Sequence, residues 1–442
     1  MKVKNMNYKK KILFTTPVLE HPPAGGPQLR IENSVKALSK VSELHLISRV
    51  SRRNIGGMES ESFYKSNCHN FIYSPSARQI QIGLFGKLIS YRFDVKNKKV
   101  NRIINIPFKI IDRVIKKVIN YDHAGTSIEN DAEDAEFIKQ YVLQNKIDIL
   151  WFGYGNISYQ LMKSLKEMMP DIKMVCDTDS VWSRFVLREL PYEKDPARRD
   201  RIERDGRLKE QEESKWVEFC DVTTAVSEVD AHYYRGLTRN PSKIMLFSNV
   251  IDLESYKKIE NKPIGLQNPS IYLAGSFGPK SPMDKAARWF LADIYPIIKK
   301  EVPNIHFYII GTGSKETLND ITDRSITVLG KVASVLPYLQ HIDVSIVPLQ
   351  FESGTRFKIM EAAACKKPIV STTLGAEGIP VKNGRHLLIA DTPQSFAEAV
   401  IKLLKNDLLS KKIANECHKL ISQSYSIKSL TLEALSIIER LS

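Results

Sequence analysis

Short apolar runs rich in β-branched residues alternate along this chain with segments of helix length, and the pattern occurs in two blocks. Strands that alternate with helices form parallel sheets covered on both faces. Each block therefore predicts one doubly wound, Rossmann-like α/β domain. The expected strands are Lys11–Pro17, Glu43–Val50, Ile147–Gly155, Ile172–Asp179 and Val222–Ser227 in the first block, and Ile271–Phe277, His306–Gly311, Ile326–Leu329, Val344–Pro348, Pro368–Thr372 and His386–Ala390 in the second.

The join between the blocks is expected near Asn249–Lys262, where a strand ends and a polar stretch begins. The length of 442 residues suits two such domains. We therefore predict domains at residues 1–249 and 250–424, followed by an amphipathic helix within residues 425–442. Ligands of open α/β sheets lie beyond the carboxyl ends of the strands, so the cleft between the two sheets is the expected active site.

The net charge of +15 is concentrated in two segments. Met1–Lys11 carries five lysines and no acidic residue, and Arg78–Lys117 carries 11 basic and 2 acidic residues, which gives +9. Such a localised basic surface indicates a polyanionic partner. No nucleic-acid-binding motif accompanies it, so we expect no nucleic-acid partner.

Within the basic insertion, at about residues 78–121, the segment Val100–Tyr121 has a helical pattern with an apolar and a basic face. The apolar face holds Ile110, Ile111, Val114, Ile115, Val118 and Ile119, and the basic face holds Lys109, Asp112, Arg113, Lys116 and Lys117. This pattern is typical of a helix on an anionic membrane surface. The alternative is a helix that packs on the core and turns its basic face to water.

The five cysteines form no CxxC pair, and no apolar run is long enough to cross a bilayer. These features favour a reducing, cytoplasmic environment. The predicted location is the cytoplasm, peripheral at the inner face of the membrane.

The segment FESGTRFKIMEAAACKKPIVSTT reads as a glycine-containing loop and a helix that begins near Thr355. A helix start offers free N–H groups and the positive end of a dipole to a phosphate. Gly354 permits close approach, Arg356 provides a bidentate phosphate contact, and Lys358 adds a second positive charge. Glu361 is placed to accept hydrogen bonds from ribose. The segment thus predicts a cradle for a nucleoside diphosphate, and the alternative is an ordinary strand–helix turn with an exposed glutamate.

The same segment closely resembles the donor-binding signature of retaining glycosyltransferases of the group 1 type (family 4), which have the GT-B fold. The resemblance covers Ile271–Leu404, where further family motifs follow in order: Gly275-Ser-Phe, Asp284-Lys-Ala-Ala-Arg-Trp-Phe, Ile294-Tyr-Pro, Ile309-Ile-Gly-Thr-Gly, Leu329-Gly-Lys-Val, Asp343–Pro348 and Gly375-Ala-Glu-Gly-Ile. It is looser in the first half, at Pro22-Pro-Ala-Gly-Gly, Val226-Ser-Glu-Val-Asp and Ser248-Asn-Val-Ile-Asp.

The resemblance implies that Glu361 holds the donor ribose and that the last helix crosses back to the first domain. The amides near Gly354–Arg356 would hold the diphosphate, so Ser353, Gly354 and Thr355 are expected among the donor-binding residues. By the same resemblance, the donor base lies beside Lys331 and Val332. Gly25 and Gly26 approach the donor phosphate or the acceptor from the opposite domain.

The sequence departs from the family pattern at three places. The first of two glutamates often found eight positions apart is replaced by Ser353, next to Glu352. The usual Arg and Lys after the first strand of the second domain are reduced to Lys280, so Lys280, Arg356 or Lys358 would neutralise the diphosphate.

At the third place, Asp179 stands where many members have a histidine. Together with Asp177 it is placed to orient a sugar or an acceptor hydroxyl; the alternative is a pair of turn and cap residues.

These features predict a transferase that moves a sugar with retention from a nucleoside diphosphate sugar to a glycan acceptor. The basic insertion favours a lipid-linked acceptor in the assembly of a cell-surface polysaccharide or glycoconjugate. Catalysis would rest on positioning and on stabilising the departing diphosphate, with no metal and no cofactor besides the donor. Two alternatives are a GT-B nucleotide-sugar epimerase and a non-catalytic partner that binds a glycan or another transferase.

Overall fold

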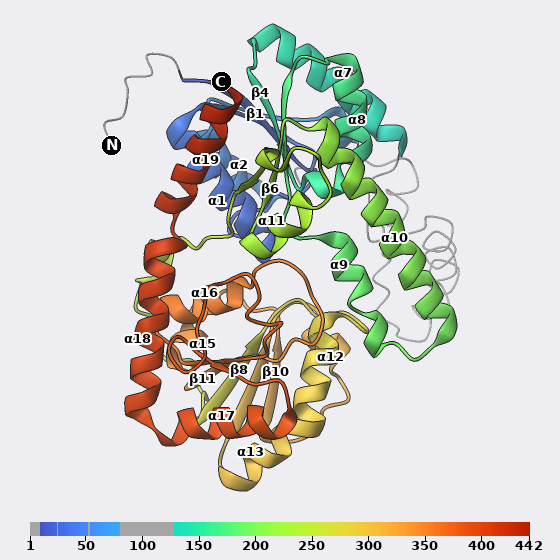
Figure 1. Ribbon diagram of the computed structural model, residues 1–442. Coiled ribbons are helices and arrows are strands. Elements are labelled where there is room, and N and C mark those ends of the chain that lie inside the picture. Colours follow the sequence, from blue (N-terminus) through green and yellow to red (C-terminus); the bar gives the residue numbers. More distant parts are fainter. Residues whose placement is uncertain (1–8, 24, 52–53, 80–127) are drawn as a thin grey trace, which may run out of the picture.

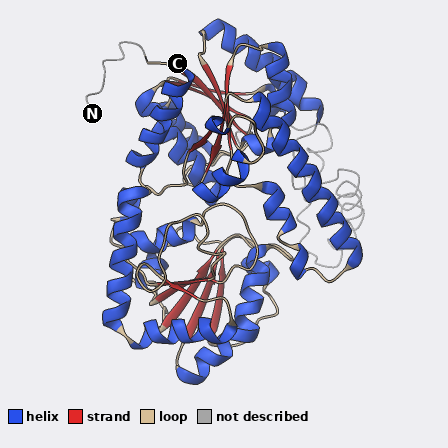
Figure 2. Cartoon of the chain, viewed as in Figure 1, coloured by secondary structure: helices blue, strands red, loops and turns tan. Residues whose placement is uncertain are grey.

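The computed structural model describes residues 9–23, 25–51, 54–79 and 128–442. They form two lobes, each built around a parallel sheet with helices on both faces (Figures 1 and 2). This confirms the predicted pair of doubly wound α/β domains. The basic helix expected within Val100–Tyr121 lies outside the described residues.

The first sheet has the strand order β3-β2-β1-β4-β5-β6-β7, and the second has the order β10-β9-β8-β11-β12-β13. The first sheet consists of β1 (Lys11–Thr16), β2 (Glu43–Ser48), β3 (Asn70–Tyr73), β4 (Ile149–Gly153), β5 (Lys173–Asp177), β6 (Val222–Ala225) and β7 (Ile244–Leu246). The second consists of β8 (Ser270–Ala274), β9 (His306–Ile310), β10 (Ile326–Gly330), β11 (Val344–Val347), β12 (Ile369–Ser371) and β13 (Leu388–Ile389). Each strand expected from the sequence is present, and β3 and β7 are additional.

The helices of the first lobe are α1 (Gly26–Val41), α2 (Gly57–Asn67), α3 (Pro75–Gln79), α7 (Ile128–Asn145), α8 (Tyr159–Met168), α9 (Trp182–Leu187), α10 (Pro196–Phe219) and α11 (Glu228–Arg235). Those that follow are α12 (Pro282–Trp289), α13 (Tyr295–Glu301), α14 (Ser314–Thr317), α15 (Leu336–His341), α16 (Phe357–Ala364), α17 (Pro393–Lys405), α18 (Asp407–Ser424) and α19 (Ile427–Leu441). In the part of the chain that is described, none of these helices combines the length and the apolarity needed to cross a membrane.

The first sheet is buried on both faces because its strands are apolar at consecutive positions. Side chains alternate between the faces of a strand, so Ile12 and Phe14 belong to one apolar cluster while Leu13 belongs to the cluster on the opposite face. Strands that are covered on both faces read as continuous apolar runs, and this is why they were visible in the sequence.

Helix α19 returns from the second lobe to the first and packs on α1 (Figure 1). Leu430, Ala434 and Ile437 of α19 are buried in the same cluster as β1. Ser248 donates two hydrogen bonds to the Glu433 carboxylate, from its N at 2.7 Å and from its Oγ at 2.8 Å. The lobes are therefore joined by two crossings of the chain, one after β7 and one between α18 and α19.

Helices α9 and α10 carry a segment of the first lobe to the second (Figure 1). Helix α10 is 24 residues long, and Gly206 on it lies so close to Leu187 of α9 that an added Cβ would be 2.4 Å from that side chain. The buried Glu213 carboxylate accepts hydrogen bonds from the Ser183 N (3.0 Å) and the Tyr233 hydroxyl (2.7 Å). These contacts fix α9, and the two residues after it reach the second lobe, where Arg188 pairs with Glu377 and Glu189 pairs with Lys285.

Candidate active site between the two lobes

The loop between β11 and α16 lies against the first lobe. Gly354 in this loop has φ +77°, which favours glycine. A Cβ at this position would also lie 2.8 Å from the Asp179 carbonyl oxygen and 3.0 Å from the Ser180 Cβ, both in the first lobe. Gly354 therefore serves both the turn itself and the close approach of the lobes.

Replacing Gly354 by Ala should separate the lobes locally and reduce turnover about tenfold or more, because the new Cβ meets backbone that cannot yield without movement. The melting temperature should change little in comparison with the turnover rate. A Gly384→Ala variant is the matched control, since Gly384 also has a positive φ but has open space at the Cβ position. Equal turnover in the two variants would contradict this role for Gly354.

Helix α16 begins at Phe357, two residues later than the sequence predicted. Arg356 has extended backbone (φ −100°, ψ 105°), and its Nη1 donates to the carbonyl oxygens of Ser353, at 2.7 Å, and Gly354. The side chain thus closes the loop, which delays the helix.

Two positive side chains of this loop and helix are short of counter-charges. Arg356 is 5% exposed, and its Nε and Nη2 atoms have no hydrogen-bond partner among the described residues. The Lys358 Nζ lies 3.1 Å from the Met283 Sδ, and burial lowers the pKa of Lys358 to about 8, although Glu352 opposes this shift. Cations removed from water without full pairing are costly, so a bound anion would stabilise both the buried Arg356 and the half-buried Lys358.

The carboxyl groups around these cations are also removed from water, with Asp230 buried and Glu352 half-buried. Burial raises the pKa of Glu352, against the charges of Arg356 and Lys358. Asp230, at the start of α11 in the first lobe, has its pKa raised to about 6 by burial, and its Oδ2 is unpartnered in the described structure. These groups leave the cations incompletely neutralised.

Glu361 lies half-buried on α16, one helical turn beyond Lys358. The Tyr256 hydroxyl donates to its Oε1 at 2.9 Å. Burial raises the pKa of Glu361, while the Tyr256 hydrogen bond and the Lys358 charge act in the opposite direction. Because Tyr256 fixes one carboxylate oxygen, the other is left to accept a hydrogen bond from a ligand.

A chain of hydrogen bonds links the loop to the interior of the first lobe. Thr355 Oγ1 accepts from Asn249 Nδ2 at 2.8 Å, and Asn249 Oδ1 accepts from Arg30 Nη1 at 2.8 Å. Arg30 in turn forms an ion pair with Asp177. Asp177 has no exposed surface, so the interpretation that it orients a sugar hydroxyl is wrong; its carboxylate holds Arg30 instead.

Asp179, by contrast, is half-buried beside the loop. Its Oδ1 accepts from Asn156 Nδ2 at 2.7 Å and from Trp182 Nε1 at 3.1 Å. Burial raises its pKa, and these hydrogen bonds oppose the shift. Two donors on one oxygen orient the carboxylate and leave its second oxygen for another group.

Some of the remaining predicted residues lie beside the loop at Gly354, and others do not. Gly26 begins α1, and a Cβ added there would lie 3.1 Å from the Phe357 ring, so Gly25 and Gly26 lie at the start of α16. Ser353 is buried, and its Oγ has no partner in the described part of the chain. These positions are brought together with the cradle.

Lys331 and Val332 follow β10, with Lys331 exposed and Val332 packed on the second core. Lys280 is exposed on the loop after β8, and its backbone N donates to Asp284 Oδ2 at 2.8 Å. No side-chain hydrogen bond or ion pair among the described residues joins Lys280 to the loop at Gly354. Arg356 and Lys358 are therefore the cations that the fold builds into the cradle.

Sequence reasoning missed several residues that shape the site. Arg188 of the first lobe forms a bidentate ion pair with Glu377 of the second (2.7 and 2.8 Å), and its Nη1 also donates to the Glu352 carbonyl oxygen at 2.7 Å. Asn249 and Glu377 lie within two of the motifs noted above, whereas Arg188 and Tyr256 lie in no recognisable pattern.

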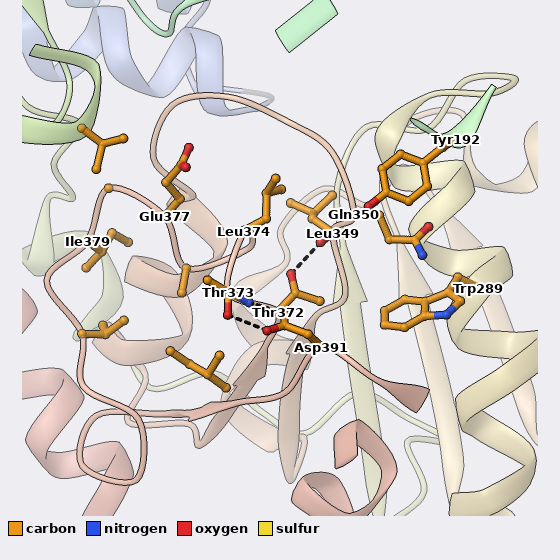
Figure 3. Close-up of a pocket in the computed structure, with 15 residues that line it drawn as sticks. Tyr192, Trp289, Leu349, Gln350, Thr372, Thr373, Leu374, Glu377, Ile379 and Asp391 are labelled. Carbon is orange, nitrogen blue, oxygen red and sulfur yellow. Dashed lines mark hydrogen bonds between the residues drawn. The ribbon is translucent and has the colours of Figure 1, made fainter. Parts of the chain in front are cut away.

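A cavity of about 630 Å³ adjoins this cradle (Figure 3). Tyr192, Gln350 and Trp289 lie along one side of it, with Asp391 below and Glu377 opposite. The predicted donor residues do not line it. It is nevertheless connected to the loop, because Gly378 in its wall lies against Thr355. Its size is that of an ordinary small-molecule site.

Comparison with protein families matches residues 268–406 to the family described as Glycosyl transferases group 1. An uncharacterized 44.6 kDa protein in the cps region of Klebsiella pneumoniae is 27% identical over 152 residues, which is 32% of this chain and 39% of that protein. An uncharacterized glycosyltransferase of Methanocaldococcus jannaschii is 24% identical over 233 residues, 48% of this chain and 63% of that one. The chain thus spans less than two thirds of either relative.

Among solved structures, Anabaena HepE in complex with UDP and glucose superposes with a TM-score of 0.62 at 11% identity, covering 97% of this chain and 99% of that one. At this identity the likeness concerns the fold. The likeness shows that this chain has the GT-B fold, and within the second lobe residues 268–406 are similar to the group 1 glycosyltransferases.

Proposed function

We propose that the chain transfers a sugar, with retention of anomeric configuration, from a nucleoside diphosphate sugar to a glycan acceptor. The observation that carries this proposal is the pair of incompletely paired cations, the buried Arg356 and the half-buried Lys358, beside the Glu361 carboxylate. Cations suit a diphosphate, and an oriented carboxylate suits the ribose hydroxyls. The bound UDP and glucose in the structure of HepE support a donor of this class.

In this mechanism Arg356 and Lys358 stabilise the negative charge that develops on the departing diphosphate. The bond from the anomeric carbon to the diphosphate oxygen breaks, and the bond to the acceptor oxygen forms on the same face of the sugar. The acceptor proton passes to the departing phosphate oxygen. The protein then supplies charge and position, without a nucleophile of its own. Asp179, oriented by Asn156 and Trp182, is assigned to hold a sugar or acceptor hydroxyl.

The test is a thermal-shift screen with UDP-, GDP-, ADP-, dTDP- and CMP-sugars, since a ligand that binds only the folded state raises the melting temperature. One nucleotide should give a clear shift, and that donor should then be consumed in the presence of glycan acceptors. Conversion of the donor to its epimer without an acceptor would indicate an epimerase. No shift with any donor at saturation would favour the non-catalytic alternative.

We assign the cavity beside the cradle to the acceptor sugar. It has aromatic walls, from Tyr192 and Trp289, together with polar groups at Gln350 and Glu377. Sugar rings present both C–H faces and hydroxyl groups, which such a lining can contact together. Tyr192 comes from the first lobe and Trp289 from the second, so the cavity depends on the contact between the lobes.

Replacing Tyr192 by Ala should lower kcat/KM for the acceptor about tenfold, because one aromatic wall of the cavity is lost. Hydrolysis of the donor by water should stay unchanged. Tyr192 is 43% exposed, so the variant should remain folded. Tyr192→Phe keeps the ring that stacks on Phe351 and should retain most of the activity. Equal loss of transfer and hydrolysis would contradict the assignment.

The acceptor in this proposal is lipid-linked, and the enzyme acts at the cytoplasmic surface of a membrane during assembly of a cell-surface polysaccharide. The +9 charge of Arg78–Lys117 and the cps-region relative support this part. Replacing Arg113, Lys116 and Lys117 by Ser should reduce co-sedimentation of the protein with anionic vesicles, since basic residues are attracted to anionic lipid. Co-sedimentation with neutral vesicles should stay the same. Unchanged co-sedimentation would contradict it.

A further inference from the structure

Three side chains with metal-binding atoms converge at the amino ends of β2 and β3, the edge of the first sheet that lies away from the cleft. Glu43 and His45 share one face of β2 because side chains alternate along a strand. His69 directly precedes β3, and its N donates to the Leu44 carbonyl oxygen at 2.7 Å. The pairing of the two strands thus brings a second imidazole to the first.

The distances among these atoms suit one shared cation. His45 Nε2 lies 3.2 Å from Glu43 Oε1, and His69 Nε2 lies 3.8 Å from the same oxygen. All three ligand atoms lie within 4.8 Å of one another. Bonds of about 2.0–2.1 Å in a tetrahedral zinc site separate the ligand atoms by roughly 3.3 Å. Small side-chain adjustments therefore suffice to bring the three atoms onto one ion.

A hydrogen-bond network behind the cluster orients the buried imidazole. His45 Nδ1 lies 2.8 Å from the Tyr141 hydroxyl of α7, which also accepts from Asn70 Nδ2 at 2.8 Å. Metal-bound histidines usually have such a partner on their other ring nitrogen. The tyrosine oxygen can accept a hydrogen bond from the Nδ1–H group, which leaves the Nε2 lone pair free to bind a metal.

The cluster opens toward water on one side. The His45 side chain is 3% exposed, Glu43 is 31% exposed and His69 is 61% exposed. A cation can therefore enter without unfolding the sheet edge, and solvent can supply a fourth ligand. One competitor is present, since the Lys11 Nζ lies 3.4 Å from Glu43 Oε1.

We propose that Glu43, His45 and His69 bind one zinc ion, with water in the fourth position. Two imidazoles and a carboxylate form a ligand set that zinc favours. The ion would tie the edge strand β3 to β2 and, through Tyr141, to α7. It would stabilise the first lobe and take no part in sugar transfer.

The test uses the full chain, freed of any histidine tag and of metal by chelation. Added ZnSO4 should bind at one equivalent and raise the melting temperature, whereas MgSO4 should do neither. Loss of a partner of a metal ligand typically costs about 10- to 100-fold in affinity. The loss of zinc affinity in Tyr141→Phe should fall in that range. His69→Ala and Glu43→Gln each remove a ligand, so they should lower zinc affinity about 100-fold or more.

Two further variants make the result specific. His232→Ala removes an exposed histidine of α11 outside the cluster and should bind zinc like the wild type. Lys11→Met removes the competing ammonium and should bind zinc more tightly. Because His69 is largely exposed, the metal-free His69→Ala chain should melt like the metal-free wild type.

Failure to bind zinc in the wild type, or undiminished affinity in His69→Ala, would overturn the proposal. Donor-sugar binding should be the same with and without zinc, so the zinc site and the proposed transferase activity succeed or fail independently.

Discussion

Replacing Glu361 by Gln should weaken binding of the donor about 10- to 100-fold while the chain stays folded. A hydrogen bond to a charged group contributes about 1.5–3 kcal/mol, and about 1.4 kcal/mol corresponds to a tenfold change in affinity. Glutamine keeps the shape of the side chain and an oxygen for the Tyr256 hydroxyl, but it loses the charge and one acceptor. Calorimetric titration with the donor found in the thermal-shift screen measures the effect.

Two controls separate a ligand role for Glu361 from a structural one. Glu398→Gln changes an exposed glutamate on α17 and should leave binding unchanged. Tyr256→Phe removes the hydroxyl that holds Glu361 Oε1 and should weaken binding only a few-fold, because the carboxylate itself remains. Wild-type affinity in Glu361→Gln would remove Glu361 from the donor site.

Replacing Lys358 by Met should lower kcat about 100- to 1000-fold, the loss expected when one stabilising donor is removed from a developing anion. The wild type should also show a characteristic pH dependence. Burial lowers the pKa of Lys358 to about 8, so in the free protein the ammonium loses its proton above that pH. A bound diphosphate favours the ammonium and raises its pKa, and donor binding above pH 8 therefore takes up a proton.

The dissociation constant of the donor should consequently rise with pH above 8, by up to about tenfold per pH unit. Below pH 8 Lys358 is charged in both the free and the donor-bound protein, so it adds no pH dependence to the dissociation constant. Lys358→Met should bind weakly with no such slope, and Lys358→Arg should bind without the slope while keeping much of the affinity, because arginine stays charged. A slope that persisted unchanged in Lys358→Met would assign the titration to another group.

The sheets could be predicted because buried parallel strands leave a direct signal, a short apolar run between polar segments. The strands that escaped prediction, β3 and β7, are the two edges of the first sheet and contain four and three residues. Each of these two strands buries a single residue, so the continuous apolar run that marks the central strands of the first sheet is lacking there. The start of α16 was misplaced by two residues, since the Arg356 side chain bonds the loop carbonyls and holds its own backbone extended.

The cradle could be predicted because its parts lie within a few residues of one another in the sequence. The groups that orient those parts come from far away in the chain: Tyr256 lies 105 residues from Glu361, and Asn249 lies 106 residues from Thr355. Asn249 reaches Thr355 only because the two lobes dock, whereas Tyr256 packs on the core of the second lobe and reaches Glu361 within that lobe. No spacing rule in the sequence encodes either contact. For the same reason the sequence pattern did not distinguish Lys280 from Lys358, although Lys280 is exposed and Lys358 lies half-buried beside Met283.

The return of α19 to the first lobe has a consequence for synthesis of the protein. Ribosomes make residues 427–441 after the whole of the second lobe, yet these residues cover apolar surface of α1 in the first. The apolar surface of α1 therefore stays uncovered on the nascent first lobe while the second lobe emerges from the ribosome and folds. During this interval chaperones that recognise apolar surfaces can bind the exposed side of α1. A chain stalled before Leu430 should therefore bind chaperones far more often than one released after Leu441.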